Sequence, residues 1–473
     1  MKKKINVKQI VDKKLCTGCG GCKAVCPINI IDMKVDKHGI CTPKVIHEKC
    51  IDCGLCLKVC PGGEFDYLHY MNKIHGGIPK NVAIGPVVDA YAAATTDNEI
   101  HKISQSGGFV STLLIYGLEN NLFDGVVVTG WSSDDPTVPK VYIARTKEEV
   151  LDSVGSKYNS VPVASIASEI SKLEGKFAFV GTSCQIHAMR KIEENTNLIN
   201  DKISIYIGLH CYKVFNYHIF DYIFHKSKIR KDKIRSFKYR DKIPRGWPGD
   251  ISLKFKNLSK VSLDKNRYRI TPKPYYSNWR CQLCFDKFNE FSDISCGDCR
   301  IPKHYNAKTM EQVNFKSLGK SDIVVRTARG KIIMDNLIKE NKIDIEDAEI
   351  NDMIRSVGPA EKKLGVNYNS DFIRKIGGYA PNYGIKFLMN DPDKPNKQTN
   401  KQIRHENFSR LIAINYYLSH SLNKYKLFRA ILKRTPSKIL YYLTRLTEGR
   451  SVQVKNRHVD KLFIKKIEKE TER

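Results

Sequence analysis

The chain has 473 residues, which is enough for two or three domains with their own cores. Its 15 cysteines, together with a polar start that lacks an apolar leader, predict a reducing, cytoplasmic location where thiols bind metal. No apolar run reaches the roughly 18 residues of a membrane-spanning helix. The formal charge of +30 comes without a nucleic-acid-binding motif. We therefore expect no nucleic acid, but a lysine-rich surface that attracts acidic partners.

Two cysteine runs of identical spacing stand near the start of the chain. Each reads C-x2-C-x2-C-x3-C-P, from Cys16 to Pro27 and again from Cys50 to Pro61. This spacing wraps three thiolates around one iron–sulfur cube, while the fourth cysteine of each run reaches the neighbouring cluster. Two intact copies with a following proline disfavour zinc and disulfides. We predict two 4Fe-4S clusters, one held by Cys16, Cys19, Cys22 and Cys60, the other by Cys50, Cys53, Cys56 and Cys26.

The two runs belong to a ferredoxin-like unit that we place at residues 1–75. Between them, the segments 30–36 and 40–45 have the pattern of a small hairpin that turns at His38 and Gly39. Cys41 lies on this hairpin, outside both runs, and we interpret it as a packed thiol. A glycine-rich linker is expected at 76–80.

From residue 88 the chain alternates short apolar strands with helices, which is the pattern of a sheet covered by helices. The predicted strands are 89–94, 124–130, 141–144, 176–180 and 203–209. The predicted helices are 110–118, 147–153 and 186–194.

Two glycine-containing turns in this region could bind a ligand. Ser106, Gly107 and Gly108 precede a helix, where free backbone amides suit a phosphate, although a plain helix cap explains them equally well. Lys157 and Tyr158 follow the second turn. A cation beside an aromatic ring could hold a pyrophosphate and cover a flavin, and a surface turn explains the same residues.

Cysteines also follow two of the predicted strands. Cys184 comes after 176–180 and Cys211 after 203–209, so both would lie at the same edge of a parallel sheet, where ligands commonly bind. Each alone is equally compatible with a buried free thiol. Beyond a basic, strand-rich stretch at 226–275, four more cysteines have the spacing C-x2-C-x11-C-x2-C, which is typical of a structural zinc knuckle. These are Cys281, Cys284, Cys296 and Cys299.

A strand at 322–326 and a helix at 331–339 are expected to close the domain. A polar linker at 390–396 leads to the segment 400–473, which holds 18 Lys and Arg against 6 Asp and Glu, a charge of +12. Its amphipathic stretches predict a basic helical tail. Such helices either lie on an anionic membrane surface, here the inner face, or pack on the protein itself.

Taken together, the motifs from about residue 10 to 340 resemble the beta-subunit family of coenzyme F420 hydrogenase/dehydrogenase. The similar versions carry an N-terminal dicluster ferredoxin and often accompany surface-polysaccharide genes. Besides the two runs, the resemblance rests on residues 106–109, 155–158, 181–185, 208–211, 281–284 and 293–298. It implies an α+β protein with a mixed α/β flavin and iron–sulfur domain after the ferredoxin. We divide that domain into an FAD-binding part at 82–165 and a C-terminal part at 166–390.

The resemblance also implies cofactors. The third 4Fe-4S cluster would use Cys184, Cys211, Cys281 and Cys284, and we favour this set over the zinc knuckle. The FAD would contact Ser106, Gly107, Gly108, Lys157, Tyr158 and Thr182. Two residues depart from the family pattern: Ser183 replaces a usual proline, and Tyr212 replaces a frequent histidine. The redox partner can therefore differ from that of other members.

We expect an oxidoreductase that depends on iron–sulfur clusters and a flavin. Its carrier would be ferredoxin or a reduced deazaflavin or nicotinamide, and its substrate a small molecule. Clusters pass single electrons whereas hydride carriers take two, so a flavin has to stand between them. The alternative is a non-catalytic electron-transfer subunit of a larger redox complex.

Overall fold

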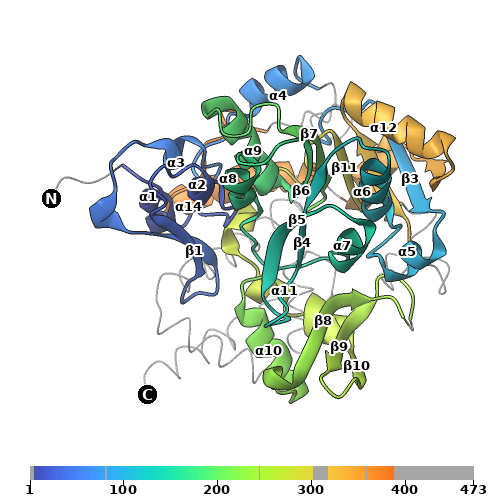
Figure 1. Cartoon of the computed structure of the whole chain (residues 1–473). Helices are drawn as coiled ribbons and strands as arrows, with labels where there is room; N and C mark the ends of the chain where they lie inside the picture. Colours follow the sequence, from blue (N-terminus) through green and yellow to red (C-terminus); the bar gives the residue numbers. More distant parts are fainter. Residues whose placement is uncertain are drawn as a thin grey trace, which may run out of the picture.

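The structure is a computed structural model that describes residues 5–79, 83–243, 245–301, 318–357, 359–375 and 377–387 (Figure 1). The linker at 390–396 and the basic tail at 400–473 lie outside these residues. Within the described ranges, no helix is both long and apolar enough to cross a membrane. The four-part division of the chain stays a prediction.

The N-terminal unit contains the predicted hairpin and two short helices. Strands β1 (Ile31–Val35) and β2 (Cys41–Val45) pair antiparallel, which confirms the hairpin. Helices α2 (Gly21–Ala24) and α3 (Leu55–Lys58) each begin after a glycine with positive φ, +91° at Gly20 and +74° at Gly54. Cys41 is 5% exposed and burial raises its pKa to about 12, so it is a packed thiol as expected.

The body is built on an eight-stranded sheet with the strand order β13-β3-β12-β11-β7-β6-β4-β5. Its central strands β11, β7, β6 and β4 run parallel, and antiparallel strands flank them on both sides. The sheet is therefore mixed. The strands are β3 (Asp89–Thr95), β4 (Gly125–Trp131), β5 (Pro139–Ala144), β6 (Phe177–Thr182), β7 (Ile203–Leu209), β11 (Ile294–Asp298), β12 (Ser321–Val325) and β13 (Ile343–Asp347).

Helices cover both faces of this sheet because its strands are apolar on both sides. On β6, Phe177 and Phe179 join one core and Ala178 the other. Helix α9 (Ser183–Asn195) packs on the first face, and α6 (Phe109–Glu119) with α12 (Ala328–Lys339) on the second (Figure 1). Further helices are α1 (Lys8–Asp12), α4 (Tyr67–His75), α5 (Asn98–Ile103), α7 (Lys147–Asp152), α8 (Ala167–Ile170), α11 (Lys273–Tyr276) and α13 (Ile350–Val357).

The basic stretch forms a smaller unit of its own. Strands β8 (Ile234–Asp241), β9 (Asp250–Phe255) and β10 (Lys260–Leu263) make a three-stranded antiparallel sheet. Helix α10 (His218–Ser227) shares an aromatic and aliphatic core with this sheet, at the bottom of Figure 1.

The ferredoxin-like unit shares a core with the body. Helix α2 contacts α9 and the 3-10 turn η2 (Val163–Ile166), and Phe65 stacks on His187 with ring centroids 4.0 Å apart. The predicted strand and helix form as β12 (Ser321–Val325) and α12, but the expectation that they close the domain is wrong. Strand β13 extends the sheet beside β3, and α14 (Pro359–Lys375) packs against η5 (Trp279–Leu283).

After α14 the chain returns to the ferredoxin-like unit. The amides of Phe65 and Tyr67 donate to the carbonyls of Asn382 and Tyr383 at 3.0 and 3.1 Å. The amide of Asn382 donates to Gly63 at 2.8 Å. Three backbone hydrogen bonds thus join the N-terminal unit to the last described segment.

Candidate functional site

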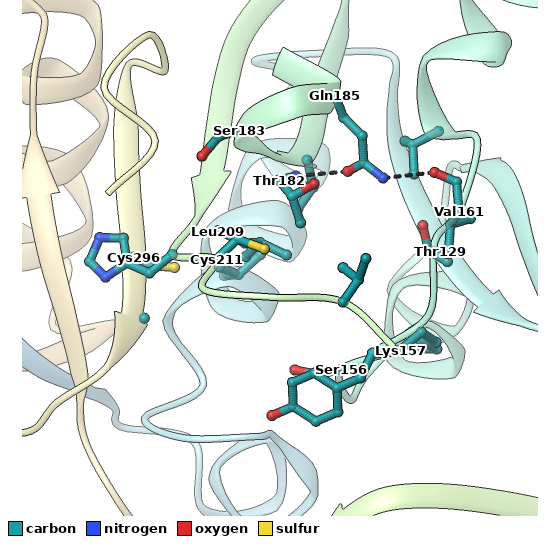
Figure 2. Close-up of a pocket in the computed structure, with 18 of the residues that line it drawn as sticks. Thr129, Ser156, Lys157, Val161, Thr182, Ser183, Gln185, Leu209, Cys211 and Cys296 are labelled. Carbon is teal, nitrogen blue, oxygen red and sulfur yellow. Dashed lines mark hydrogen bonds between the residues drawn. The ribbon is translucent and has the colours of Figure 1, made fainter. Parts of the chain in front are cut away.

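A cavity of about 350 Å³ opens at the C-terminal ends of β6 and β7. Thr182 and Cys184 line it from the β6–α9 junction, and Leu209 and Cys211 from the end of β7. Gln185 braces the junction, because it accepts from the amide of Thr182 at 2.7 Å and donates to the carbonyl of Val161 at 2.8 Å (Figure 2). The two cysteine-bearing strand ends therefore lie together at the ligand-binding edge of the sheet, as predicted.

The glycine turn before α6 forms one wall of the cavity, but not all of its residues face the cavity. Ser106 and Gly108 line the cavity, but the Ser106 hydroxyl donates to the carbonyl of Lys320. Gly107 packs against β3, where an added Cβ would come within 2.2 Å of the Ala93 carbonyl oxygen. The Ser106 side chain and Gly107 thus hold the turn in place.

Three polar groups on the cavity wall make no hydrogen bond within the described part of the chain. They are the Ser104 hydroxyl, the Gln105 amide nitrogen and the Asn159 amide nitrogen, all buried. A buried polar group without a partner costs on the order of 1–3 kcal/mol, so a ligand that pairs with these groups would be favoured. Nothing in the local sequence marked these residues, because their spatial convergence depends on the fold.

Lys157 lines the cavity, but its ammonium group binds the protein. Its Nζ donates to the carbonyl of Ser153 at 2.5 Å and lies 6.0 Å from the ring centroid of Trp131. Burial, together with the charge of Lys238, lowers the pKa of Lys157 to about 7. Lys157 thus fixes the turn that forms this wall.

Tyr158 lies between two arginines. Burial raises the pKa of its hydroxyl, but the charges of Arg240 and Arg269 outweigh burial and leave the pKa below its ordinary value. Arg240 donates to the Tyr158 oxygen at 3.3 Å, pairs with Asp298 at 2.7 Å and donates to the carbonyl of Gln105 at 3.2 Å. Arg240 comes from β8, so the small basic sheet contributes a cavity residue that sequence reasoning missed.

The structure brings Cys184, Cys211, Cys281 and Cys284 together at one end of the cavity. All four line it, and the pKa of Cys184 is raised well above its usual value by burial and by the charges of Cys19, Cys211 and Cys284. Burial and the charges of Cys281 and Cys284 raise the pKa of Cys211 to about 12. Desolvated thiols of this kind stay protonated in the absence of a metal ion, and metal binding displaces their protons.

Lysines surround this cysteine group on the side of Tyr212. The Nζ atom of Lys362 donates to the carbonyl of Cys281 at 2.5 Å. Lysine Nζ atoms lie 4.7–5.5 Å from the centroid of the Tyr212 ring, and they belong to Lys213, Lys273, Lys287 and Lys362. At the other departure from the family pattern, the Ser183 hydroxyl donates to the carbonyl of Asp286 at 2.8 Å, which proline could not do.

The fourth thiol of each cysteine run lies close to thiols of the other run, Cys60 to Cys16 and Cys26 to Cys56. Burial and the charges of Cys60 and Cys19 raise the pKa of Cys16. Burial raises the pKa of Cys56, and the charges of Cys53, Cys50 and Cys26 raise it further. Backbone amides point at the sulfurs, from Gly18 to Cys16, from Gly62 to Cys60 and from Val7 to Cys56, at 3.3–3.4 Å. Such amide–sulfur contacts are the usual surroundings of iron–sulfur clusters.

The first cysteine group lies next to the cavity. Thr17 and Pro61 line it, and the carbonyl of Cys19 accepts from the amide of Ala164 at 2.9 Å. Arg280, which is 3% exposed and precedes Cys281, donates to the carbonyls of Leu15 and Gly62. One buried side chain thus ties the first group to the Cys281 segment.

Cys296 and Cys299, the second half of the possible zinc knuckle, lie in two different apolar cores. Cys296 belongs to the core of the main sheet, and the fully buried Cys299 belongs to another core beside Ile84 and Phe288. Among the described residues, no group of three or more His, Cys, Asp or Glu side chains is arranged around one metal ion. Zinc would need four ligands within about 2.3 Å of a single point.

We expect Asp322→Asn to stabilise the protein above neutral pH. Asp322 is fully buried near Cys299, and burial raises its pKa from 3.8 to about 7. The folded state therefore binds a proton more tightly than the unfolded state, and this stability is lost as the pH rises from about 4 to 7. The amide keeps the shape without the charge. Thermal unfolding at pH 5 and pH 8 should show a variant-minus-wild-type difference that grows with pH, and a constant difference would contradict this.

Comparisons with known proteins agree with this geometry. Residues 15–63 match a family model of the 4Fe-4S dicluster domain. Residues 90–168 and 174–351 match the models of the N-terminal and C-terminal parts of the coenzyme F420 hydrogenase/dehydrogenase beta subunit. The coenzyme F420 hydrogenase subunit beta of Methanococcus voltae is 30% identical over 266 residues, covering 55% of this chain and 84% of that protein. The chain belongs to the coenzyme F420 hydrogenase/dehydrogenase beta-subunit family.

A sulfite reductase and a hydrogenase complex contain two further chains similar to this one. The coenzyme F420-dependent sulfite reductase of Methanocaldococcus jannaschii is 27% identical over 361 residues, covering 72% of this chain and 49% of that protein. A chain of the F420-reducing [NiFe] hydrogenase complex from Methanosarcina barkeri aligns with a TM-score of 0.50 at 21% identity. That alignment covers 65% of this chain and all of the other, and shows a shared fold. As a member of the beta-subunit family with a dicluster domain, the chain is an iron–sulfur electron-transfer protein.

Proposed function

We propose that the protein is an iron–sulfur flavoprotein oxidoreductase. It passes electrons between two ferredoxin-type 4Fe-4S clusters, a third 4Fe-4S cluster, FAD, and a soluble two-electron carrier or small-molecule substrate. The third cluster would bind Cys184, Cys211, Cys281 and Cys284. One observation carries the proposal: a single cavity has this cysteine group and the first ferredoxin loop on its walls, together with the Ser106 turn.

The rest of the cavity suits a flavin dinucleotide. The whole cavity, including its cysteine end, has a volume of about 350 Å³, in the range of small-molecule sites. Away from the cysteines, Ser104, Gln105 and Asn159 offer a ligand unsatisfied polar groups. The turn at Gly108 starts an eleven-residue helix, whose N-terminus favours a phosphate. Bound FAD would supply the conversion between single electrons and a hydride. Lys157, Tyr158 and Thr182 also line the cavity and are proposed to contact the flavin.

Acid release from iron-replete protein should yield noncovalent FAD, and Lys157→Ala should reduce its occupancy. The variant removes the tie between Lys157 and the carbonyl of Ser153, so the turn that lines the cavity loosens. We expect flavin binding to weaken roughly tenfold, about 1.4 kcal/mol, with unchanged iron content. HPLC of the released cofactor and iron analysis measure both. The exposed Lys147 serves as the control in Lys147→Ala. A fully metallated protein without FAD or FMN would exclude the flavin.

The names of the relatives favour a second role. Methanococcus voltae and Methanosarcina barkeri proteins named as subunits are similar to this chain, so it is also a candidate for a non-catalytic electron-transfer subunit. The isolated, reconstituted chain can be mixed anaerobically with reduced deazaflavin, NADH, NADPH and reduced ferredoxin. Flavin bleaching by one of the two-electron carriers supports the oxidoreductase. Bleaching that requires a copurified catalytic partner supports the subunit role.

A further inference from the structure

The two cysteine runs are copies of one motif, but their surroundings differ. Gly20 of the first run lies against the body, where an added Cβ would come within 2.6 Å of the Pro162 carbonyl oxygen. At the equivalent Gly54 of the second run, an added Cβ would meet nothing within 4 Å among the described residues. Thr17 lines the cavity, whereas its counterpart Ile51 is 60% exposed. The first run thus uses this surface to pack on the body, whereas the equivalent surface of the second run is open.

This open surface is apolar around the second cysteine group. Ile5, Ile28 and Ile51 are 56%, 40% and 60% exposed, and they line the hollow between Cys26, Cys50, Cys53 and Cys56, where the second cluster is proposed to sit. Cys53 is the exposed member of this group. We call Ile5, Ile28, Ile51, Cys50 and Cys53 the Cys53 face. Exposed isoleucines that gather in one place, rather than singly, mark interaction sites.

Exposed lysines outnumber exposed acidic residues in the segment 44–58. Lys44, Lys49 and Lys58 are exposed, against Glu48 and Asp52, and Asp52 accepts from the amide of Ile5 at 3.1 Å. This excess of positive charge is complementary to an acidic partner.

The place of the two cysteine groups in the relay determines what kind of partner fits. Thr17 and Pro61, which flank Cys16 and Cys60, line the cavity, so the first group is the inner end. The second group is the outer end, with Cys53 exposed. A relay that ends inward at the cavity has to exchange electrons with the solution at its outer cluster.

We propose that the Cys53 face docks a small acidic protein that carries one electron at a time, of the ferredoxin class. The inference rests on the proposed relay function. In the encounter, one electron leaves the iron centre of the carrier, which is oxidised, and enters the cluster held by the second cysteine group, which is reduced. No bond forms or breaks and no proton moves.

Stopped-flow reduction of the full-length, reconstituted protein by a reduced, acidic plant-type ferredoxin tests the proposal. Lys49→Glu with Lys58→Glu should lower the second-order rate constant about tenfold at low salt and weaken its salt dependence. Ile51→Ser should lower it several-fold by removing apolar contact. The matched controls are Lys254→Glu with Lys256→Glu, exposed near β9, and Ile332→Ser, 62% exposed on α12. Both controls should leave the rate constant within about twofold of wild type.

Reduced methyl viologen, a small reductant that needs no docking surface, should reduce all variants equally, which shows that their clusters are intact. Unchanged ferredoxin rates in the Cys53-face variants, or equal losses in the controls, would overturn the proposal. If reduced viologen reduces the wild-type protein and reduced ferredoxin does not, the docking proposal is also overturned, but the proposed relay is unaffected. If viologen-reduced clusters fail to reduce the bound flavin, the proposed function fails instead. A wild-type dimer that Ile51→Ser dissociates would make the face a contact between copies and overturn the carrier.

Discussion

Cys184→Ser should remove about four of about twelve irons from the reconstituted protein. Cys184 lies between Cys211, Cys284 and Cys19, so it closes one corner of the third cysteine group. A serine oxygen is a poor iron ligand, and the three remaining thiols would leave the cube open. The ferredoxin groups use other cysteines and should keep their iron. Iron and sulfide analysis with EPR of the reduced protein measures the loss.

The matched controls replace buried thiols outside the three groups. Cys41 lies on the hairpin beside the first group, and Cys296 lies on β11 beside the third. Cys41→Ser and Cys296→Ser should both retain the full iron content and contain no zinc. Iron that stays complete in Cys184→Ser, with zinc released from Cys296→Ser, would establish the zinc knuckle and remove the third cluster.

Gly20→Ala should destabilise the protein considerably more than Gly54→Ala. Both glycines precede a short helix with positive φ, so alanine pays about 1–2 kcal/mol of left-handed strain at either position. At Gly20 the new methyl group also meets the Pro162 backbone at 2.6 Å, whereas at Gly54 it meets nothing within 4 Å. Overpacking of this kind costs roughly another 1–3 kcal/mol. The difference between the two variants isolates the contact between the ferredoxin loop and the body.

Anaerobic thermal unfolding, followed by loss of cluster absorbance, compares the two variants. The midpoint should fall by a few degrees more in Gly20→Ala, since proteins of about 150–250 residues lose roughly 2–4 °C per kcal/mol and a larger chain loses less. Equal midpoints would mean that the loop at Gly20 does not pack against Pro162. They would also remove the structural asymmetry on which the Cys53 face depends.

Sequence reasoning worked where chemistry is local. The spacing of each cysteine run predicts how its thiols divide between two cubes, and the structure groups Cys16 with Cys60 and Cys56 with Cys26. Short apolar runs predicted the strands of the main sheet except β11 and β13. The parallel pairing of β6 with β7 then brings Cys184 and Cys211 to one edge. Both outcomes depend on short stretches of sequence. The spacing within a run assigns its thiols, and the shared direction of parallel strands places their ends at the same edge of the sheet.

The parts that sequence reasoning missed depend on contacts between distant segments. The Arg240 guanidinium reaches the cavity from a separate sheet, and Ser104, Gln105 and Asn159 become partnerless only once the walls close around them. The sequence of the glycine turn suits a phosphate or a plain helix cap equally well, and it does not reveal that Gly107 is required by the closeness of β3. Such roles are invisible in a single sequence, since the neighbours that define them lie far away along the chain.

The return of the chain to the ferredoxin-like unit constrains how the relay operates. Asn382 and Tyr383 form backbone hydrogen bonds with Gly63, Phe65 and Tyr67. The N-terminal unit is therefore held by the chain that follows it directly and also by the last described segment. It cannot swing like a tethered shuttle that visits donor and acceptor in turn. In the proposed relay, electrons would therefore cross fixed gaps by tunnelling, at a rate set by distance and driving force and independent of the viscosity of the medium.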